Sequence, residues 1–379
     1  MAFPTVIINI LNMMRGSIPS VAFHFLFVGY GDVPDGETRH LIMVDNTSDL
    51  DEILTDKKAN ASLMATMKAA QLNGKQSWTA GVMILKEGDN WQDAVKLANE
   101  TSSFEAFVLD FPATNKALLE DAVALRHTLK AKLGREVFVI ATTPKIDVTA
   151  ETGQTWAEWL ATTSAIPMGV ASEYITVVPQ VHLTNSSIGI YAGRLANQEV
   201  SIADSPARVK TGSILGSSEL AVDNAGKPLE LAILKALEAN RYSVPMWYPD
   251  YPGQYWTTGN TLDVPGGDFQ DIRHIRVVMK AARKVRVRAI ARIADREFNS
   301  TPGSMASAKL YFTQDLREMA ITQTIGDYEF PGEIKPPLDE DITITWINSD
   351  EVEILLAVTP YECPVKITCG IMLNKRLGA

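Results

Sequence analysis

The stretch AGVMILKEGDNWQDAVKLANETSSFEAFVLD, residues 80–110, decides the fold class of this chain. It holds two short, continuous apolar runs, Ala80 to Leu85 and Phe104 to Leu109, of the kind that form strands buried on both faces. Between them lies a segment, begun near Asn90, whose apolar residues follow helical spacing. Strand, helix and strand in this order predict a parallel sheet covered by helices.

The same alternation continues on both sides of this stretch. Asn115 to Leu133 has the apolar spacing of a helix closed by Gly134, and Val137 to Thr142 reads as a third buried strand. Upstream, Val21 to Tyr30 and Leu41 to Val44 are further apolar runs. An α/β domain is therefore expected, although the pattern weakens after this third strand.

The carboxy-terminal part of the chain has a different pattern. Two helices are expected at about Phe269 to Asp295 and Ser304 to Thr322. Ile342 to Trp346 and Glu353 to Val358 then alternate apolar and polar residues around a polar turn, which is typical of a β-hairpin. Val365 to Leu373 is a last extended segment.

The expected fold is therefore α/β, and α+β overall. It combines a sandwich-like α/β domain, a carboxy-terminal domain of two helices and a β-hairpin, and extended strand arms at both termini. The expected divisions are an amino-terminal linker arm at 1–20, the α/β region at 21–220, the carboxy-terminal domain at 221–362 and a carboxy-terminal linker arm at 363–379.

Composition indicates an ordinary globular protein, with 46% hydrophobic and 21% charged residues among 379. The formal net charge of −10 argues against nonspecific binding of nucleic acid by the whole surface.

Met1 to Met14 lacks a basic leader and is too short to span a bilayer, so neither a signal peptide nor a membrane segment is expected. Cys363 and Cys369 would lie about 20 Å apart on a strand, so two free thiols are expected.

Residues with the spacing of a catalytic or cofactor site are scarce. The five histidines have no metal-ligand spacing, and Gly29-Tyr30-Gly31 lacks the third glycine of a dinucleotide fingerprint, which would fall at Pro34. Gly74-Lys75 is followed by Gln76, so a phosphate loop is not formed. Asp110 directly follows a predicted strand, at the position where α/β enzymes often keep a catalytic carboxylate. We expect no cofactor, metal or catalysis, and the alternative is an α/β enzyme or nucleotide-binding protein with its site near Asp110.

One basic segment lies in this acidic chain. Asp271 to Arg296 contains nine basic and two acidic residues and no Glu. Its apolar residues follow one side of the predicted helix, so the cations fall on the other side, and only Arg286 points toward the apolar stripe. A solvated face usually mixes both signs, so a face toward a partner is expected, and nucleic acid and an acidic protein surface both fit. The candidate binding residues are Arg273, Arg276, Lys280, Arg283, Lys284, Arg288 and Arg292.

The order of several short motifs resembles the contractile tail sheath family of phages, R-type pyocins and related contractile injection systems. Tyr255 to Leu262 is similar to the tryptophan, glycine and "RTL" segment before the family's attachment helix, with Asn260 in place of the usual Arg. A tyrosine-to-proline segment, then AG, PA and glycine motifs precede it, at Ser172 to Pro179, Gly189 to Gly193, Asp204-Ser205-Pro206-Ala207 and Gly212 to Gly216.

The resemblance implies a structural subunit, without catalysis, that stacks in helical rings around a tail tube. Release of the extended rings into a contracted state would drive the tube through the host envelope. The implied partners are further copies of the chain, the tail tube protein, and baseplate and tail terminator proteins, without nucleic acid or membrane insertion. The subunit would belong to the tail sheath of a virion and assemble in the host cytoplasm. Residues 221–362 would be proximal to the tube, with the basic helix against the tube or an acidic neighbour.

Such an assembly needs links between subunits that survive a rearrangement. Strand segments without a partner of their own fit this need, because a strand added to a neighbour's exposed edge makes main-chain hydrogen bonds. The candidates are Val6, Ile7, Ile8 and Ile10 in the amino-terminal arm, Ile342, Ile344, Trp346, Ile354 and Leu356 in the hairpin, and Val365 and Ile367 in the carboxy-terminal arm.

Overall fold

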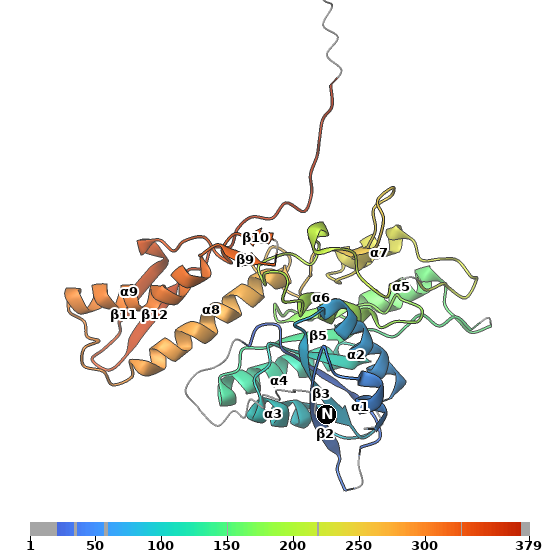
Figure 1. Cartoon of the computed structure of the whole chain (residues 1–379), viewed down its shortest axis with the longest axis horizontal. Coiled ribbons are helices and arrows are strands. Elements are labelled where there is room, and N and C mark those ends of the chain that lie inside the picture. Colours follow the sequence, from blue (N-terminus) through green and yellow to red (C-terminus); the bar gives the residue numbers. More distant parts are fainter. Residues whose placement is uncertain are drawn as a thin grey trace, which may run out of the picture.

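A computed structural model of the chain describes residues 21–33, 36–56, 60–149, 151–217, 220–326 and 328–372. Its body is built on a six-stranded sheet in the order β2-β3-β1-β4-β5-β6 (Figure 1). Every pairing is parallel except that of the edge strand β2 with β3. The strands are β1 (Phe25–Tyr30), β2 (Arg39–Asp45), β3 (Thr79–Leu85), β4 (Ala106–Pro112), β5 (Phe138–Thr142) and β6 (Ile175–Val178).

Helices cover both faces of this sheet because its central strands are apolar on both. Leu26 and Val28 of β1 face one core, whereas Phe25 and Phe27 face the other. The first core is closed by α3 (Trp91–Thr101), α4 (Ala117–Leu133), α5 (Trp156–Ala165) and α7 (Leu231–Ala239), and the second by α1 (Leu50–Asp56), α2 (Ala61–Gly74) and α6 (Ser187–Leu195).

Two glycines bring α6 directly onto α2. A Cβ atom at Gly189 would lie 2.3 Å from the carbonyl oxygen of Thr66, and one at Gly193 would lie 2.4 Å from that of Ala70. Real side chains cannot approach backbone so closely, so only glycine permits this helix contact. The close contact brings Ser186, just before α6, beside the helix α2.

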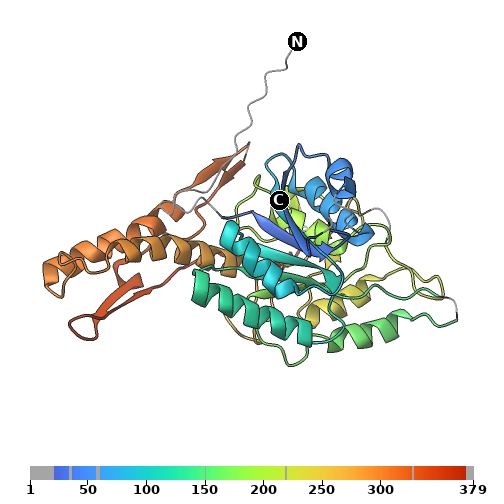
Figure 2. The ribbon, with the colours of Figure 1, turned by 90° about the horizontal axis from the view of Figure 1, so that it is seen from below.

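A second unit projects from the body, as Figures 1 and 2 show. It consists of the long helices α8 (Ile272–Ala291) and α9 (Pro302–Met319) and the antiparallel hairpin of β11 (Ile342–Trp346) and β12 (Val352–Leu356). The start of α8 belongs to the body, since Ile272, Ile275 and Met279 lie in its second core. The far end has a small core of its own, built around Ala308, Phe312, Ile342 and Ile344.

A third core fills the joint between the body and the projecting unit. It includes Ala22, just before β1, together with Ile202 of the body. From the projecting unit it includes Val277, Ala281, Leu316, Met319 and Ile334. The described chain thus begins inside the joint, at the point where the two units meet.

The remaining elements are short. They are η1 (Val209–Thr211), β7 (Pro245–Met246), β8 (Tyr255–Trp256), β9 (Gln323–Ile325), β10 (Tyr328–Phe330) and η2 (Asp339–Asp341). Trp256 and α7 pack in the cores of the body, so residues 221–262 lie with the α/β unit rather than with the two long helices. In the described part of the chain, no helix combines the length and the apolar character needed to cross a membrane.

Candidate functional site

The basic helix α8 is capped by Asp271, whose carboxylate accepts a hydrogen bond from the backbone N–H of Arg273 at 3.1 Å. The other carboxylate oxygen accepts from Nε of the same arginine at 2.8 Å. Ile275 and Met279 then bury one side of the helix in the body. The cations predicted as one outward row are thereby distributed over the remaining sides, toward several different acidic residues.

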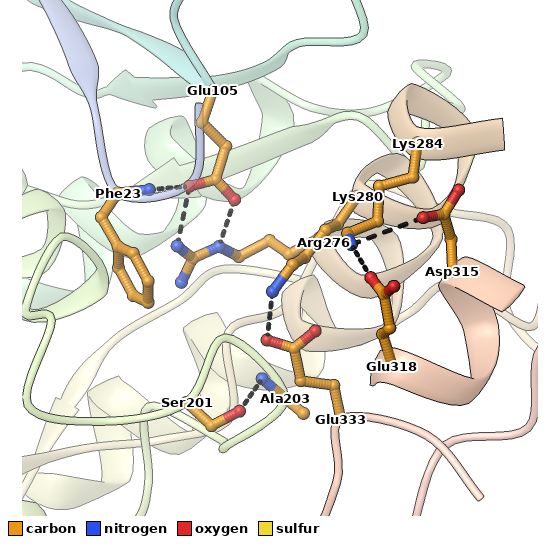
Figure 3. A network of polar contacts seen from close by, with 10 residues as sticks. All are labelled: Phe23, Glu105, Ser201, Ala203, Arg276, Lys280, Lys284, Asp315, Glu318 and Glu333. Carbon is orange, nitrogen blue, oxygen red and sulfur yellow. Dashed lines mark hydrogen bonds and ion pairs between the residues drawn. The ribbon is translucent and has the colours of Figure 1, made fainter. Parts of the chain in front are cut away.

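Arg276 does not belong to an exposed row, which corrects the expectation from the sequence. Its side chain is 3% exposed, and Nε and Nη2 donate to the two carboxylate oxygens of Glu105 at 2.7 and 2.8 Å (Figure 3). Glu105 lies just before β4 and is fully buried, so it requires a cation at this position. The backbone N–H of Phe23, which has φ 72°, donates to the same carboxylate at 2.6 Å. Arg276 therefore connects α8 to the sheet and, through Glu105, to the segment just before β1.

The charge state of Glu105 follows from this arrangement. Burial alone would raise the pKa of its carboxyl group, but the charge and hydrogen bonds of Arg276 outweigh burial and hold the pKa below its ordinary value. The carboxylate of Glu105 is consequently ionised at neutral pH. Removing one partner would leave a buried charge without compensation, whereas the intact pair fixes the position of α8 on the body.

The other candidate cations on this helix and at its end also have partners within the chain. Lys280 binds Glu333 at 2.6 Å, Lys284 binds Glu318 at 3.1 Å, and both pairs are drawn in Figure 3. Arg288 binds Asp315, Arg292 binds Asp295 at 2.5 Å, and Arg283 donates to the carbonyl oxygen of Glu136 at 3.3 Å. Six of the seven candidate cations, all but Arg283, thus form ion pairs among the described residues.

A sequence signal for part of this pairing exists. Asp315 and Glu318 lie three residues apart on α9, and Lys284 and Arg288 lie four residues apart on α8. Such spacings place each pair on one side of its helix, so two packed helices can match them. The sequence analysis missed this match because it considered the basic helix without α9.

The carboxy-terminal arm is the least covered part of the described chain. It runs away from both units in Figure 1 and has no strand partner among the described residues. Val365 and Ile367 are 62% and 75% exposed, and Ile371 is 97% exposed. With Cys369 they form a strict alternation, which is the pattern of a half-buried strand.

The hairpin candidates divide into a buried and a half-buried group. Ile342 and Ile344 are buried against Phe312, so they hold the hairpin to α9 rather than facing a neighbour. Ile354 and Leu356 are half-buried on the same side, and Trp346 packs edge-on against Phe298 at 5.5 Å. Within the described residues the sheet has two strands only, so both of its outer edges are open.

The candidates Val6, Ile7, Ile8 and Ile10 lie outside the described residues.

Asp110 lies at the carboxyl end of β4, beside a cavity of about 310 Å³ that Ser62, Thr142 and Lys145 also line. The hydroxyl of Thr66 donates to its carboxylate at 2.5 Å and is 2.6 Å from the hydroxyl of Ser186. Burial raises its pKa to about 6, against the opposing hydrogen bonds of Thr66 and Ser62. No group of three His, Cys, Asp or Glu side chains that could hold a metal occurs among the described residues. Among the described residues, the hydrogen-bond partners of Asp110 are hydroxyl groups, and no histidine, cysteine or lysine side chain binds it.

Comparison with known proteins now identifies the family. Two family profiles described as the DUF2586 N-terminal and C-terminal domains match residues 3–260 and 268–376. A protein of Haemophilus phage HP1 (strain HP1c1) named "Putative tail sheath protein" is 42% identical over 376 residues, which cover 98% of each chain. The chain belongs to this DUF2586 family of tail sheath proteins.

Solved sheath structures share the fold of this sheath subunit. The PVC sheath complex of an extracellular contractile injection system, in the contracted state, superposes with a TM-score of 0.60 at 12% identity, covering 99% of this chain and 98% of that one. The sheath tail protein of Listeria innocua gives 0.57 at 10% identity, with 91% and 93% covered. Membership of this family of tail sheath proteins makes the chain a structural subunit of a tail and not an enzyme, which leaves no support for the alternative of a catalytic or nucleotide site at Asp110.

Proposed function

We propose that the sheath subunit assembles into helical rings around a tail tube and contracts to drive that tube through the host envelope. The observation that carries this proposal is the carboxy-terminal arm. Its apolar side has the alternation of a strand, yet Ile367 and Ile371 are 75% and 97% exposed. An exposed apolar strand is an aggregation hazard unless a partner covers it, so the arm is suited to a sheet of another copy.

The hairpin of β11 and β12 offers the sheet that such an arm requires. Both outer edges present unpaired main-chain groups, and Leu355 is 57% exposed. An arm from one neighbour and the amino-terminal arm of another could enlarge this two-stranded sheet to four strands. Main-chain hydrogen bonds of this kind do not depend on how the bodies of two subunits are oriented, so they persist when the rings rearrange.

The projecting unit with α8 is proposed to lie nearest the tube. Lys284 and Arg292 remain 34% and 30% exposed despite their ion pairs, so α8 can still contribute cations toward an acidic tube wall. Ile290 at the far end of α8 and Ile293 just beyond it are 51% and 74% exposed. These exposed groups at the far end of the projection are better candidates for tube contact than Arg276, whose side chain is buried and paired with Glu105.

The same proposal includes the other members of the machine. Baseplate and tail terminator proteins would cover the two ends of the array, and assembly would take place in the host cytoplasm. Contraction would be downhill if the contracted array buries more surface than the extended one, with the extended form held kinetically.

Negative-stain electron microscopy of the purified chain, at low and high salt and with and without a tube protein, tests this function. We expect hollow striated cylinders for the native chain and monodisperse particles for a chain ending at residue 362. Ile367→Lys should also prevent assembly, whereas Thr368→Lys, on the opposite side of the arm, should preserve it. Monodisperse native particles under every condition would contradict the proposal.

A further inference from the structure

Three arginines gather where the end of α4 meets α8, and we call Arg135, Arg283 and Arg286 the arginine cluster. The guanidinium group of Arg286 lies on Gly134, since a Cβ atom built there would be 2.4 Å from its Nη2. Arg283 reaches the same segment of the body, since it donates a hydrogen bond to the carbonyl oxygen of Glu136 at 3.3 Å. The cluster therefore combines two cations of the projecting unit with one of the body.

Arg135 and Arg286 form no ion pair among the described residues, whereas burial lowers the pKa of Arg283 and the charges of Glu105, Glu136 and Glu333 act against that lowering. The nearby carboxylate of Glu136 is already engaged by Arg126 at 2.6 Å and Lys130 at 2.8 Å. Nε of Arg135 and Nη2 of Arg283 are buried without an acceptor, again among the described residues. Burial lowers the pKa of Arg135, and the charge of Arg286 lowers it further. Arg135 and Arg286, held together without an anion of their own, repel one another, so the isolated subunit leaves room for carboxylates from outside.

The opposite charge is concentrated on the hairpin. Residues 338–358 contain six acidic residues and no Lys or Arg. Glu340, Asp350 and Glu351 are exposed, and none of the six forms an ion pair among the described residues. The hairpin thus carries an unmatched negative charge, just as the cluster carries an unmatched positive charge.

We propose that the arginine cluster of one subunit binds the acidic hairpin of a second copy. This inference rests on the proposed assembly of copies and adds a charged contact to it. Two different surfaces meet in such a contact, so it is head-to-tail and propagates along a helical array. A protein carboxylate suits the cluster better than a nucleic-acid phosphate, because the chain's net charge of −10 repels a polyanion.

Charge exchange tests the contact in the full-length chain, with assembly measured by sedimentation and electron microscopy. Arg135→Glu with Arg286→Glu should raise the concentration needed for assembly at least about tenfold, and Glu340→Lys with Glu351→Lys should do the same. All four substitutions in one chain should restore assembly to within about threefold of the native chain. Arg317→Glu, an exposed cation of α9 outside the cluster, is the matched control and should change little.

The remaining outcomes are decisive as well. Normal assembly of the reversed cluster, or no recovery in the exchanged chain, would overturn the contact. Weakened assembly of the hairpin variant alone would also overturn the contact, because the hairpin carboxylates would then bind the arms and not the cluster. Residues 1–20 and 363–379 of these arms carry four cations and no acid. If the reversed chain does not fold by circular dichroism, Arg135→Gln with Arg286→Gln takes its place with a smaller expected effect. Failure of the native chain to form cylinders would count against the proposed function itself.

Discussion

The two ends of β4 carry buried carboxylates in opposite situations. Glu105, at the amino end, is paired with Arg276 at 2.7 Å and has a lowered pKa. Asp110, at the carboxyl end, has hydroxyl partners, and its pKa is raised to about 6. Enzymes of this architecture place their chemistry at the carboxyl end. In this sheath subunit the strongly engaged end is the amino end, where the projecting unit joins the body.

Breaking the pair at the amino end should have the largest effect. Arg276→Met leaves Glu105 buried without a cation, and we expect the free energy of unfolding to fall by about 3 to 5 kcal/mol. Urea unfolding followed by tryptophan fluorescence measures it. A second variant, with Glu105→Leu added, should recover much of the loss, because an apolar pair needs no compensation. A loss below about 1 kcal/mol for Arg276→Met would show that the joint does not depend on this pair.

The two carboxylates should also give opposite dependences of stability on pH. Asp110 has a raised folded pKa, so its contribution is favourable at low pH and is lost as pH rises from about 4 to 6, by about 3 kcal/mol. Glu105 has a lowered folded pKa, so its contribution is present above its ordinary value of 4.5 and is lost as pH falls below that value. Urea unfolding between pH 3 and 8 should show that Asp110→Asn removes the decline in stability between about pH 4 and 6 and leaves the loss at lower pH unchanged. An unchanged profile in that range would argue against a buried, protonatable Asp110.

The hydroxyl partners at the carboxyl end can be tested through Thr66. Thr66→Val removes the group 2.5 Å from Asp110 and 2.6 Å from Ser186, and should cost about 1 to 3 kcal/mol in the free energy of unfolding. Loss of this donor should also raise the pKa of Asp110 further and steepen the decline of stability with pH. Thr66→Ser keeps the hydroxyl and should retain the native profile. Equal behaviour of the two variants would mean that packing, and not the hydrogen bond, matters here.

The smallest effect is expected away from both ends, at the partly exposed ion pairs between α8 and α9. Lys284→Met breaks the pair with Glu318, whose side chains are 34% and 50% exposed. Because water screens such a pair, the change in the free energy of unfolding should be at most about 1 kcal/mol. Thermal unfolding by circular dichroism is sufficient to measure it. A loss as large as that of Arg276→Met would remove the distinction between the buried and the exposed cations of α8.

The sheet was predictable from sequence because its central strands are continuous apolar runs. The helix α5 was not identified, although Thr155 and Glu158 have the spacing of a capping box and form one at its first turn. The edge strand β2 was expected as an apolar run, but its antiparallel direction follows from tertiary pairing, which no local pattern records. The bounds of β4 also differ from the prediction. The expected strand was Phe104 to Leu109, whereas β4 begins at Ala106 and ends at Pro112.

The site was less predictable than the fold. Helical spacing located the basic helix correctly but could not show that Arg276 meets Glu105, which lies 171 residues away in the chain. Such a pairing depends on how the projecting unit packs on the body. In contrast, the alternation of apolar and polar residues around Val365 and Ile367 is a local pattern, so the sequence alone predicted an extended segment there. Periodicity thus predicts elements, whereas the partner of a long charged side chain is decided by packing.

The uncovered carboxy-terminal arm has a consequence for growth if arms are exchanged between neighbours. An array in which each subunit gives an arm in one direction and receives one from the other has two chemically different ends. One end presents empty hairpins, and the other presents arms with bare apolar residues such as Ile371, which is 97% exposed. Addition of subunits at these two ends then differs in rate, so the sheath grows with a direction that is already encoded in a single subunit.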